Sequence, residues 1–195
     1  MLKKILIPLI TLFFLAGLSG CAGTGNTLAI QPKITLPPSD PTMKAITVSI
    51  SGVDHRQSQA LAQINRDARL VTLVPSRDLR FLLQEALEKQ MTARGYMIGS
   101  PADANLQIIV NQLQANIKEG SLRHDILTKA DISIIVYAKD GSKQIKNYRT
   151  SYNAQGPLGA TNAKIADAVN TVLSDVIADM AQDSSISTFI KQNVR

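Results

Sequence analysis

Apolar and polar residues alternate in the first half of the chain with the period of a β-strand. The clearest case runs over 45–51 and is followed by Gly52, which predicts a half-buried strand that ends at this glycine. A second apolar run over 70–74 stops at Pro75 and predicts another short strand.

The residues after Pro75 carry the period of an amphipathic helix. Ser76 is the predicted N-cap, and Asp78 in the first turn suits the positive end of the helix dipole. Glu85 and Lys89 form an i,i+4 pair, and Gly95 is placed as the terminating residue. The apolar stripe consists of Leu79, Leu82, Leu83, Ala86, Leu87 and Met91.

Three longer strands are predicted next, over 106–117, 130–136 and 142–155. The first changes phase at Leu113, which indicates a β-bulge. The second ends at Asp140-Gly141, a signal for a type I′ hairpin. The third carries Tyr148 and Tyr152 on one face and polar residues on the other.

A second long helix would cover the apolar side of such a sheet. Thr161 is its predicted N-cap, and a short amphipathic helix over 186–194 follows it. The stripe contains Ile165, Val169, Val172, Val176, Ile177 and Met180. The order ββαβββα predicts an α+β fold: a mostly antiparallel sheet with two long helices on one face and a short C-terminal helix.

The first twenty residues have the anatomy of a secretory signal. Lys3 and Lys4 precede an apolar run over 5–18, too short for a spanning helix of about 20 apolar residues. The tetrapeptide LSGC that ends at Cys21 resembles the lipobox of bacterial lipoproteins. The resemblance implies cleavage before Cys21, a diacylglycerol on its sulfur and an acyl chain such as palmitate on its amino group. A plain cleaved signal with a free cysteine is the alternative.

Location follows from the same resemblance. In enterobacterial sorting an aspartate after the lipidated cysteine favours the inner membrane, and Ala22 stands there, which implies a lipid anchor in the periplasmic face of the outer membrane. The proline-rich residues 21–44 are predicted to be a flexible tether. The predicted organisation is a signal peptide over 1–20, the lipidated tether over 21–44 and one periplasmic domain over 45–195.

Charge and cysteine content narrow the range of partners. Loss of Lys3 and Lys4 with the signal lowers the net charge from +6 to +4. The basic residues are scattered, so no nucleic-acid partner is predicted. A solvated surface or a weak attraction to anionic cell-wall polymer or lipid headgroups both fit this charge. Cys21 is the single cysteine, so its acylation would leave the domain without a disulfide.

The amino-acid sequence of the chain resembles the YajG family of enterobacterial lipoproteins. The segments that carry the resemblance include ITLPPSDP, VTLVPSRDLRFLLQEALEKQMTARGYMIG and IADAVNTVLSDVIADMAQDSSISTFIKQNVR, and with others they cover nearly the whole chain. The resemblance implies an outer-membrane lipoprotein with a small α+β domain. The family is uncharacterised, so it brings no reaction, ligand or catalytic residue.

No catalytic or metal-binding constellation is predicted. His55 and His124 are the only histidines, and neither has a second ligand at helical spacing, so no metal and no cofactor are expected. The chance grouping of Asp54, His55 and Ser58 lacks the arrangement of a catalytic triad. Paired carboxylates would suit glycan hydrolysis in this compartment, yet the acidic residues sit mostly at helix starts, turns and solvated faces.

The sixteen-residue polar connection over 54–69 is the candidate interaction segment, because such long loops are often functional. Its tentative partner-binding residues are Arg56, Arg66 and Arg69, with Phe81 on the following helix as an exposed anchor. Residues 59–62 would alternatively form a helical turn, and Phe81 would pack under the connection.

The sequence therefore favours a non-enzymatic outer-membrane lipoprotein that binds an envelope protein or peptidoglycan on the periplasmic side. One alternative is an envelope enzyme that acts on cell-wall or lipid substrates, recognisable by a cleft with two carboxyl groups of raised pKa. A second is an accessory subunit of a transport or assembly complex, for which a large exposed apolar patch would be the sign.

Overall fold

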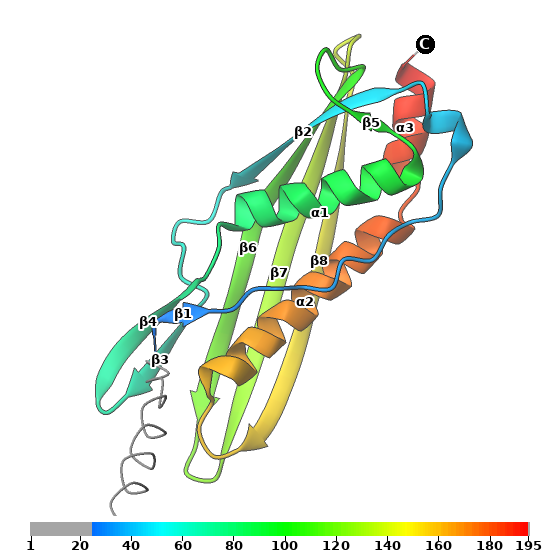
Figure 1. Cartoon of the computed structure of the whole chain (residues 1–195). Helices are drawn as coiled ribbons and strands as arrows, with labels where there is room; N and C mark the ends of the chain where they lie inside the picture. Colours follow the sequence, from blue (N-terminus) through cyan, green and yellow to red (C-terminus); the bar gives the residue numbers. More distant parts are fainter. Residues whose placement is uncertain (1–24, 195) are drawn as a thin grey trace, which may run out of the picture.

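The computed structural model describes residues 25–194, so Cys21 and the predicted signal segment lie outside it. The described chain forms two β-sheets, three α-helices and a short 3-10 helix (Figure 1). The strands are β1 (Thr27–Leu28), β2 (Thr47–Asp54), β3 (Ala62–Arg66), β4 (Arg69–Pro75), β5 (Met97–Ile98), β6 (Ala104–Glu119), β7 (Arg123–Ala138) and β8 (Lys143–Pro157). The α-helices are α1 (Leu79–Arg94), α2 (Asn162–Gln182) and α3 (Ser185–Asn193), and the 3-10 helix is Pro41–Met43.

The larger sheet is mixed, with the strand order β5-β2-β6-β7-β8. β6, β7 and β8 are antiparallel neighbours, but β2 runs parallel to both β5 and β6. The predicted α+β class is confirmed, whereas the mostly antiparallel sheet and the order ββαβββα are wrong. The chain passes from β2 to β6 by way of α1, and such a crossover returns the next strand in parallel.

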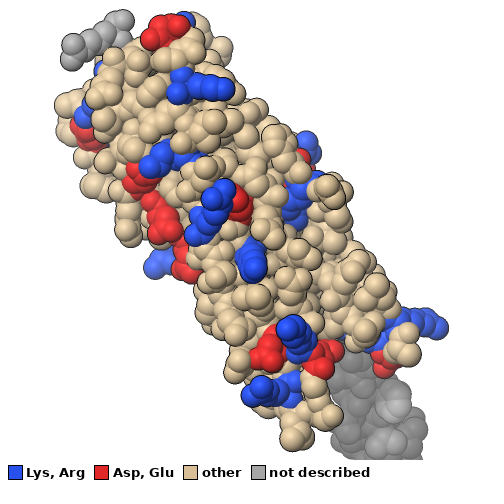
Figure 2. Space-filling view, turned by 180° about the vertical axis from the view of Figure 1, so that it is seen from behind, with Lys and Arg blue, Asp and Glu red and all other residues tan. Residues whose placement is uncertain are grey.

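Both long helices cover one face of the larger sheet (Figure 1). The predicted stripes of α1 and α2 are buried at every position, and the core lies between them and the sheet. Figure 2 shows the molecule from behind, where acidic and basic side chains are scattered over the surface. This distribution fits a solvated face better than a single charged patch.

The smaller sheet has the order β1-β4-β3 and contains two strands that the sequence did not reveal. β3 and β4 form a hairpin in which Arg66 pairs with Arg69. The two turn residues, Asp67 and Ala68, have φ values of 49° and 61°, as a type I′ turn requires. The predicted sixteen-residue connection is therefore wrong, because β3 and its turn occupy the second half of it.

Residues 25–44 lie against the domain, contrary to the expected flexible tether. Leu28 and Ile30 are fully buried, and the backbone N–H of Gln31 donates to Oδ1 of Asn170 at 2.7 Å. Figure 1 shows this segment in blue, running beside α2. The apolar side chains at the alternate positions 28 and 30 explain this packing, because both can turn toward the core of the domain.

The predicted N-cap of α1 is wrong by two residues. Asp78 is the cap, and its Oδ1 accepts from the backbone N–H of Arg80 at 2.8 Å. Ser76 instead donates its own N–H to the carbonyl of Leu28 at 2.8 Å, which ties β1 to the end of β4. Gly95 is confirmed in the left-handed conformation with φ of 109°.

The long strands confirm the predicted bulge and correct the predicted turn. The register of β6 against β7 shifts between Val110 and Gln112. The β7–β8 turn is not type I′, because that turn needs two residues with positive φ and Gly141, at 87°, is the one that has it here. Ala138 instead pairs with Ser142 across a three-residue loop.

The second predicted cap is confirmed. Oγ1 of Thr161 accepts from the backbone N–H of Lys164 at 3.3 Å, at the start of α2. The expected short C-terminal helix is present as α3, which buries Ile186 and Ile190.

Candidate functional site

A groove opens where β2 ends beside the longer β6. β2 stops at Asp54, opposite Val110, whereas β6 continues to Glu119. Beyond Val110, β6 pairs with β7 on one side, and the β3–β4 hairpin lies across the gap on the other. The resulting cavity of about 810 Å³ is lined by the 56–63 segment, by Leu70 and by 111–118 of β6, a size typical of ligand sites.

The backbone edge of β6 faces this groove. The N–H of Ala115 points away from β7 and donates to the carbonyl of Leu61 at 2.7 Å. The carbonyl of Leu113 accepts from Nη1 of Arg56 at 3.4 Å. These two edge groups are therefore already bonded within the chain. Since alternate residues of a strand direct their backbone groups to the same side, Ile117 is the next residue of β6 whose backbone faces the groove.

The groove is lined by carboxamide side chains. Each carboxamide both donates and accepts hydrogen bonds, so the lining matches a ligand with paired donors and acceptors. The amide residues, all exposed, are Gln57, Gln63, Asn111, Gln112, Gln114 and Asn116. Lys118 and Arg56 are the charged members of the lining, which contains no carboxylate among the described residues.

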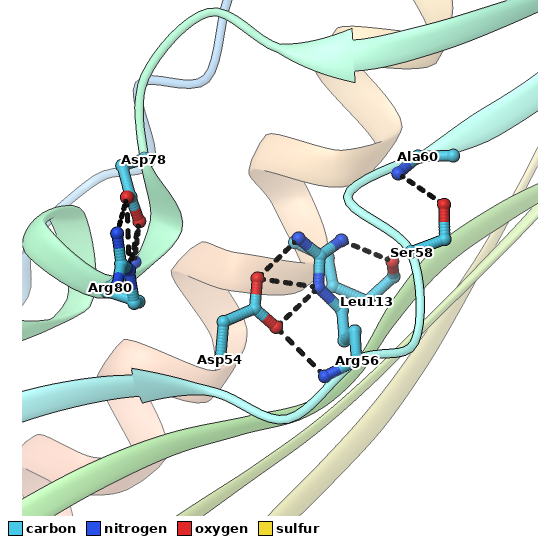
Figure 3. A network of polar contacts seen from close by, with 7 residues as sticks. All are labelled: Asp54, Arg56, Ser58, Ala60, Asp78, Arg80 and Leu113. Atoms are coloured by element: carbon cyan, nitrogen blue, oxygen red, sulfur yellow. Dashed lines mark hydrogen bonds and ion pairs between the residues drawn. The ribbon is translucent and has the colours of Figure 1, made fainter.

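One rim of the groove is held by an ion pair between Asp54 and Arg56 (Figure 3). Nε of Arg56 lies 3.0 Å from Oδ1 of Asp54, and Nη2 lies 2.8 Å from Oδ2. The two side chains are 6% and 17% exposed, in the order Arg56 and Asp54. Burial by itself raises the pKa of the Asp54 carboxyl, but the hydrogen bonds and charge of Arg56 outweigh burial and hold that pKa below its ordinary value.

A second pair of the same spacing lies nearby, at the start of α1 (Figure 3). Nη2 of Arg80 is 2.6 Å from Oδ2 of Asp78, but here the side chains are 48% and 33% exposed. The guanidinium of Arg80 also lies 5.4 Å from the ring centre of Phe81, a cation–π distance. Phe81 is 60% exposed, so it is available at the surface and does not pack under the connection.

The structure does not bring the four tentative partner-binding residues into one surface. Arg56 is buried by its ion pair, and Phe81 lies on α1. Arg66 and Arg69 flank the turn of the β3–β4 hairpin, where Nη2 of Arg66 donates to Oδ1 of Asn162 at 2.5 Å. Arg69 is exposed. The polar segment therefore contributes to the groove through its amides more than through its arginines.

The resolved shifts in carboxyl pKa among the described residues all have the same direction. Where the pKa of a carboxyl group departs from the ordinary value, it is lowered, in Asp40, Asp54, Asp78, Glu85, Asp103, Asp140 and Asp183. A general acid needs the opposite shift. The lowered values mark carboxylates that accept hydrogen bonds or pair with cations.

The two histidines lie in different environments. His124 is buried, and its Nδ1 donates to the carbonyl of Leu158 at 2.7 Å, whereas His55 is exposed. Within residues 25–194 no group of three or more His, Cys, Asp or Glu side chains is arranged to hold a metal ion. Over the same residues, none of the helices combines the length and apolar character that crossing a bilayer requires.

Comparison with known proteins places this domain among bacterial lipoproteins. The chain belongs to the family described as "Uncharacterized lipoprotein", whose model matches residues 32–191. "Uncharacterized lipoprotein YajG" of Escherichia coli strain K12 is 59% identical over 195 residues, which are 100% of both chains. The protein of the same name from strain CFT073 of E. coli O6:H1 matches equally. The predicted YajG resemblance is confirmed.

A solved structure shares the fold at low sequence identity. It is protein XCC0632 from Xanthomonas campestris, with a TM-score of 0.60 and 12% identity over 85% of this chain and 96% of that chain. A likeness at this identity supports the architecture alone.

Sequence reasoning found the 56–63 side of the groove and missed the β6 side. The residues of 111–118 were predicted as part of a strand with a bulge, and their exposed amides were not singled out as a site. The signal that distinguishes them is the bulge at Asn111, because β-bulges are over-represented at sheet edges and beside binding sites.

Proposed function

We propose that this chain is a non-enzymatic lipoprotein of the outer membrane, anchored on the periplasmic side through Cys21, that binds an extended segment of another envelope protein. The membership in a lipoprotein family and the LSGC tetrapeptide before Ala22 support the anchor and its location. The groove between β3 and β6 supports the binding role.

The observation that carries the binding role is a strand edge lined by amides. An extended peptide can add through main-chain hydrogen bonds to the part of this edge beyond Ala115, while side chains of the groove contact its side chains. The Asp54–Arg56 pair fixes the loop that forms the rim, so Arg56 acts in this proposal as a positioning residue rather than as a contact. Arg69 and Phe81, both exposed, would extend the contact outside the groove.

The groove chemistry favours binding over hydrolysis. Its lining contains Lys118 and Arg56 but no carboxylate among the described residues, and glycan hydrolysis depends on a pair of carboxyl groups. Uncharged amides instead match the N–H and C=O groups of a peptide.

The binding role is tested by crosslinking in living cells from a photoreactive residue at Gln112, which is exposed in the groove. The double variant Gln114→Ala/Asn116→Ala should lose the captured protein, because both amides line the groove. The matched control is Gln155→Ala/Asn153→Ala, which removes two exposed amides at the same spacing from β8, and it should capture as the wild type does.

Three outcomes separate the possibilities. Loss of one discrete protein product in the groove variant alone supports the proposal, provided that its thermal midpoint is unchanged. Equal capture by both double variants would place the partner surface elsewhere. A product that is released only by digestion of the glycan strands would identify peptidoglycan as the ligand.

The anchor is tested separately through Cys21→Ala. This variant should lose labelling by radioactive palmitate and should no longer float with outer-membrane vesicles in a density gradient. Labelled, floating Cys21→Ala protein would refute the assignment of the lipidated residue.

A further inference from the structure

The most exposed large apolar side chains of the described chain gather at one end of the molecule. Leu122 is 82% exposed, Leu158 is 71% exposed and Leu70 is 63% exposed. They belong to the β6–β7 turn, the connection from β8 to α2, and the β3–β4 hairpin, which lie at the same end in Figure 1. Leu122 and Leu158 are joined directly, because the N–H of Leu158 donates to the carbonyl of Leu122 at 3.0 Å.

The exposure of Leu158 is accompanied by backbone strain. Its φ is 59°, in the left-handed region that bulky residues rarely adopt. Residues held in such conformations cluster at functional sites. A leucine that is both strained and exposed gains nothing from core burial, so its apolar side chain is available for an external contact.

The described chain begins at this same end. The carbonyl of Gly25 accepts from Nδ2 of Asn162 at 2.9 Å, and Arg66 bonds the same side chain. Gly25, Arg66, Asn162 and Glu119 all line one cavity of about 690 Å³. Cys21 precedes Gly25 by four residues, which span at most about 14 Å when fully extended.

The charged groups around the three leucines are mostly basic. At the hairpin turn and at the paired ends of β6, β7 and β8, the cations are Arg66, Arg69, Lys118, Arg123 and Lys164, and the anions are Asp67, Glu119 and Asp125. One carboxylate oxygen of Glu119 is already hydrogen-bonded within the domain, since Oε1 accepts from the backbone N–H of Ala160 at 2.7 Å. Apolar side chains surrounded by an excess of cations are the composition that binds an anionic lipid surface.

We propose that this end of the domain is a membrane-docking tip, which inserts Leu122 and Leu158 among the lipid headgroups while its arginines and lysines contact anionic phosphates. The inference rests on the proposed anchor at Cys21, whose short reach would hold the tip at the bilayer surface. The groove then lies near the membrane, because Gln114 is five strand residues before the end of β6, roughly 17 Å at the rise of a strand.

The sequence provides a clean probe, because it contains no tryptophan. Single variants Leu122→Trp and Leu158→Trp place a fluorophore at the tip. The control is Met97→Trp, at a side chain that is 52% exposed and lies at the opposite end of the domain, in β5 (Figure 1). The lipidated protein is reconstituted in vesicles of phosphatidylethanolamine and phosphatidylglycerol, with and without brominated acyl chains.

Tryptophan at 122 and at 158 should emit at shorter wavelength in vesicles than in detergent-free buffer and should be quenched by brominated lipid, while tryptophan at 97 should do neither. Replacement of phosphatidylglycerol by phosphatidylcholine should reduce the quenching, since the headgroup of phosphatidylcholine carries no net negative charge to attract the cations. Wild-type thermal midpoints for all three variants establish that the probes report on the folded domain.

Equal quenching at the tip and at the control position would overturn the inference, as would no quenching at either tip position. Quenching that occurs only when extracted outer-membrane proteins are added to the vesicles would identify a protein as the partner of the tip. That result would also overturn the inference. If the protein is not lipidated in cells, the anchor proposal fails by itself. The tip is then judged with the same variants coupled through the Cys21 thiol to maleimide lipid, which reproduces the anchor chemically.

Discussion

Removal of Arg56 should destabilise the domain, because it leaves the largely buried carboxylate of Asp54 without its ion-pair partner. In Arg56→Met the apolar stem is retained while Asp54, whose side chain is 17% exposed, loses its bidentate partner. The carbonyl of Leu113 also loses a donor. Breaking a fully buried pair costs about 3–5 kcal/mol, and the partial exposure of Asp54 lowers this to about 2–4 kcal/mol.

The assay is thermal unfolding followed by circular dichroism, with Arg80→Met as the control. For a domain of this size about 2–4 °C of midpoint correspond to 1 kcal/mol, so Arg56→Met should melt roughly 4–16 °C early. Arg80 makes the same contact two residues after its aspartate, but with side chains 48% and 33% exposed. An exposed pair contributes less than about 1 kcal/mol, so Arg80→Met should melt within about 4 °C of wild type.

The double variant Asp54→Asn/Arg56→Met isolates the stranded charge. It should be more stable than Arg56→Met alone, because no ionised carboxylate is left without a partner. Equal midpoints for Arg56→Met and Arg80→Met would refute the reasoning, since burial would then make no difference to the ion pair. In that case Arg56 would be free to act as a partner contact, as the sequence first indicated.

Three further outcomes test the fold and its electrostatics. Leu83→Ala should lower the free energy of unfolding in urea by about 2–5 kcal/mol, because Leu83 is fully buried. An unchanged midpoint concentration of urea would mean that the buried face of α1 has been assigned wrongly. The stabilisation from Asp54 is complete above its ordinary pKa of 3.8 and is lost as pH falls through its lower folded pKa, so the gap in thermal midpoint between wild type and Asp54→Asn should shrink below about pH 4. A constant gap would refute this linkage. Arg94→Met should cost about 1.5–3 kcal/mol, because Nη2 of Arg94 donates to the carbonyls of Ala181 and Asp183 at 2.7 and 2.8 Å. The exposed variant Lys89→Met, by contrast, should stay within about 1 kcal/mol of wild type.

Local patterns predicted the elements that bury one face. The stripe of α1, the N-cap at Thr161 and the bulge in β6 were all readable, because each depends on residues within a few positions of one another. The cap at Asp78 was missed because Ser76 has the right chemistry, but its Oγ accepts from the backbone N–H of Ile30, which is 46 positions earlier in the chain.

Only one side of the candidate site could be predicted from the sequence, for the same reason. The 54–69 segment stood out by its polarity, but the β3–β4 turn uses Asp67 and Ala68 in place of the usual Asn-Gly, so the hairpin within it left no strong signal. The amides of 111–118 line a groove only because β2 ends at Asp54, before the end of β6, and the β3–β4 hairpin lies across the gap.

The sequence by itself determined where this protein is expected to work and which faces of its helices and strands are buried, because a lipobox and a hydrophobic period are local properties. The tertiary structure decided the direction of β2, the packing of residues 25–44 and the burial of Arg56. Each of these depends on contacts between residues far apart in the chain, such as Arg56 and Leu113, which are 57 positions apart. A period of two reports that one side of a strand is buried, but it carries no information about which strand lies beside it.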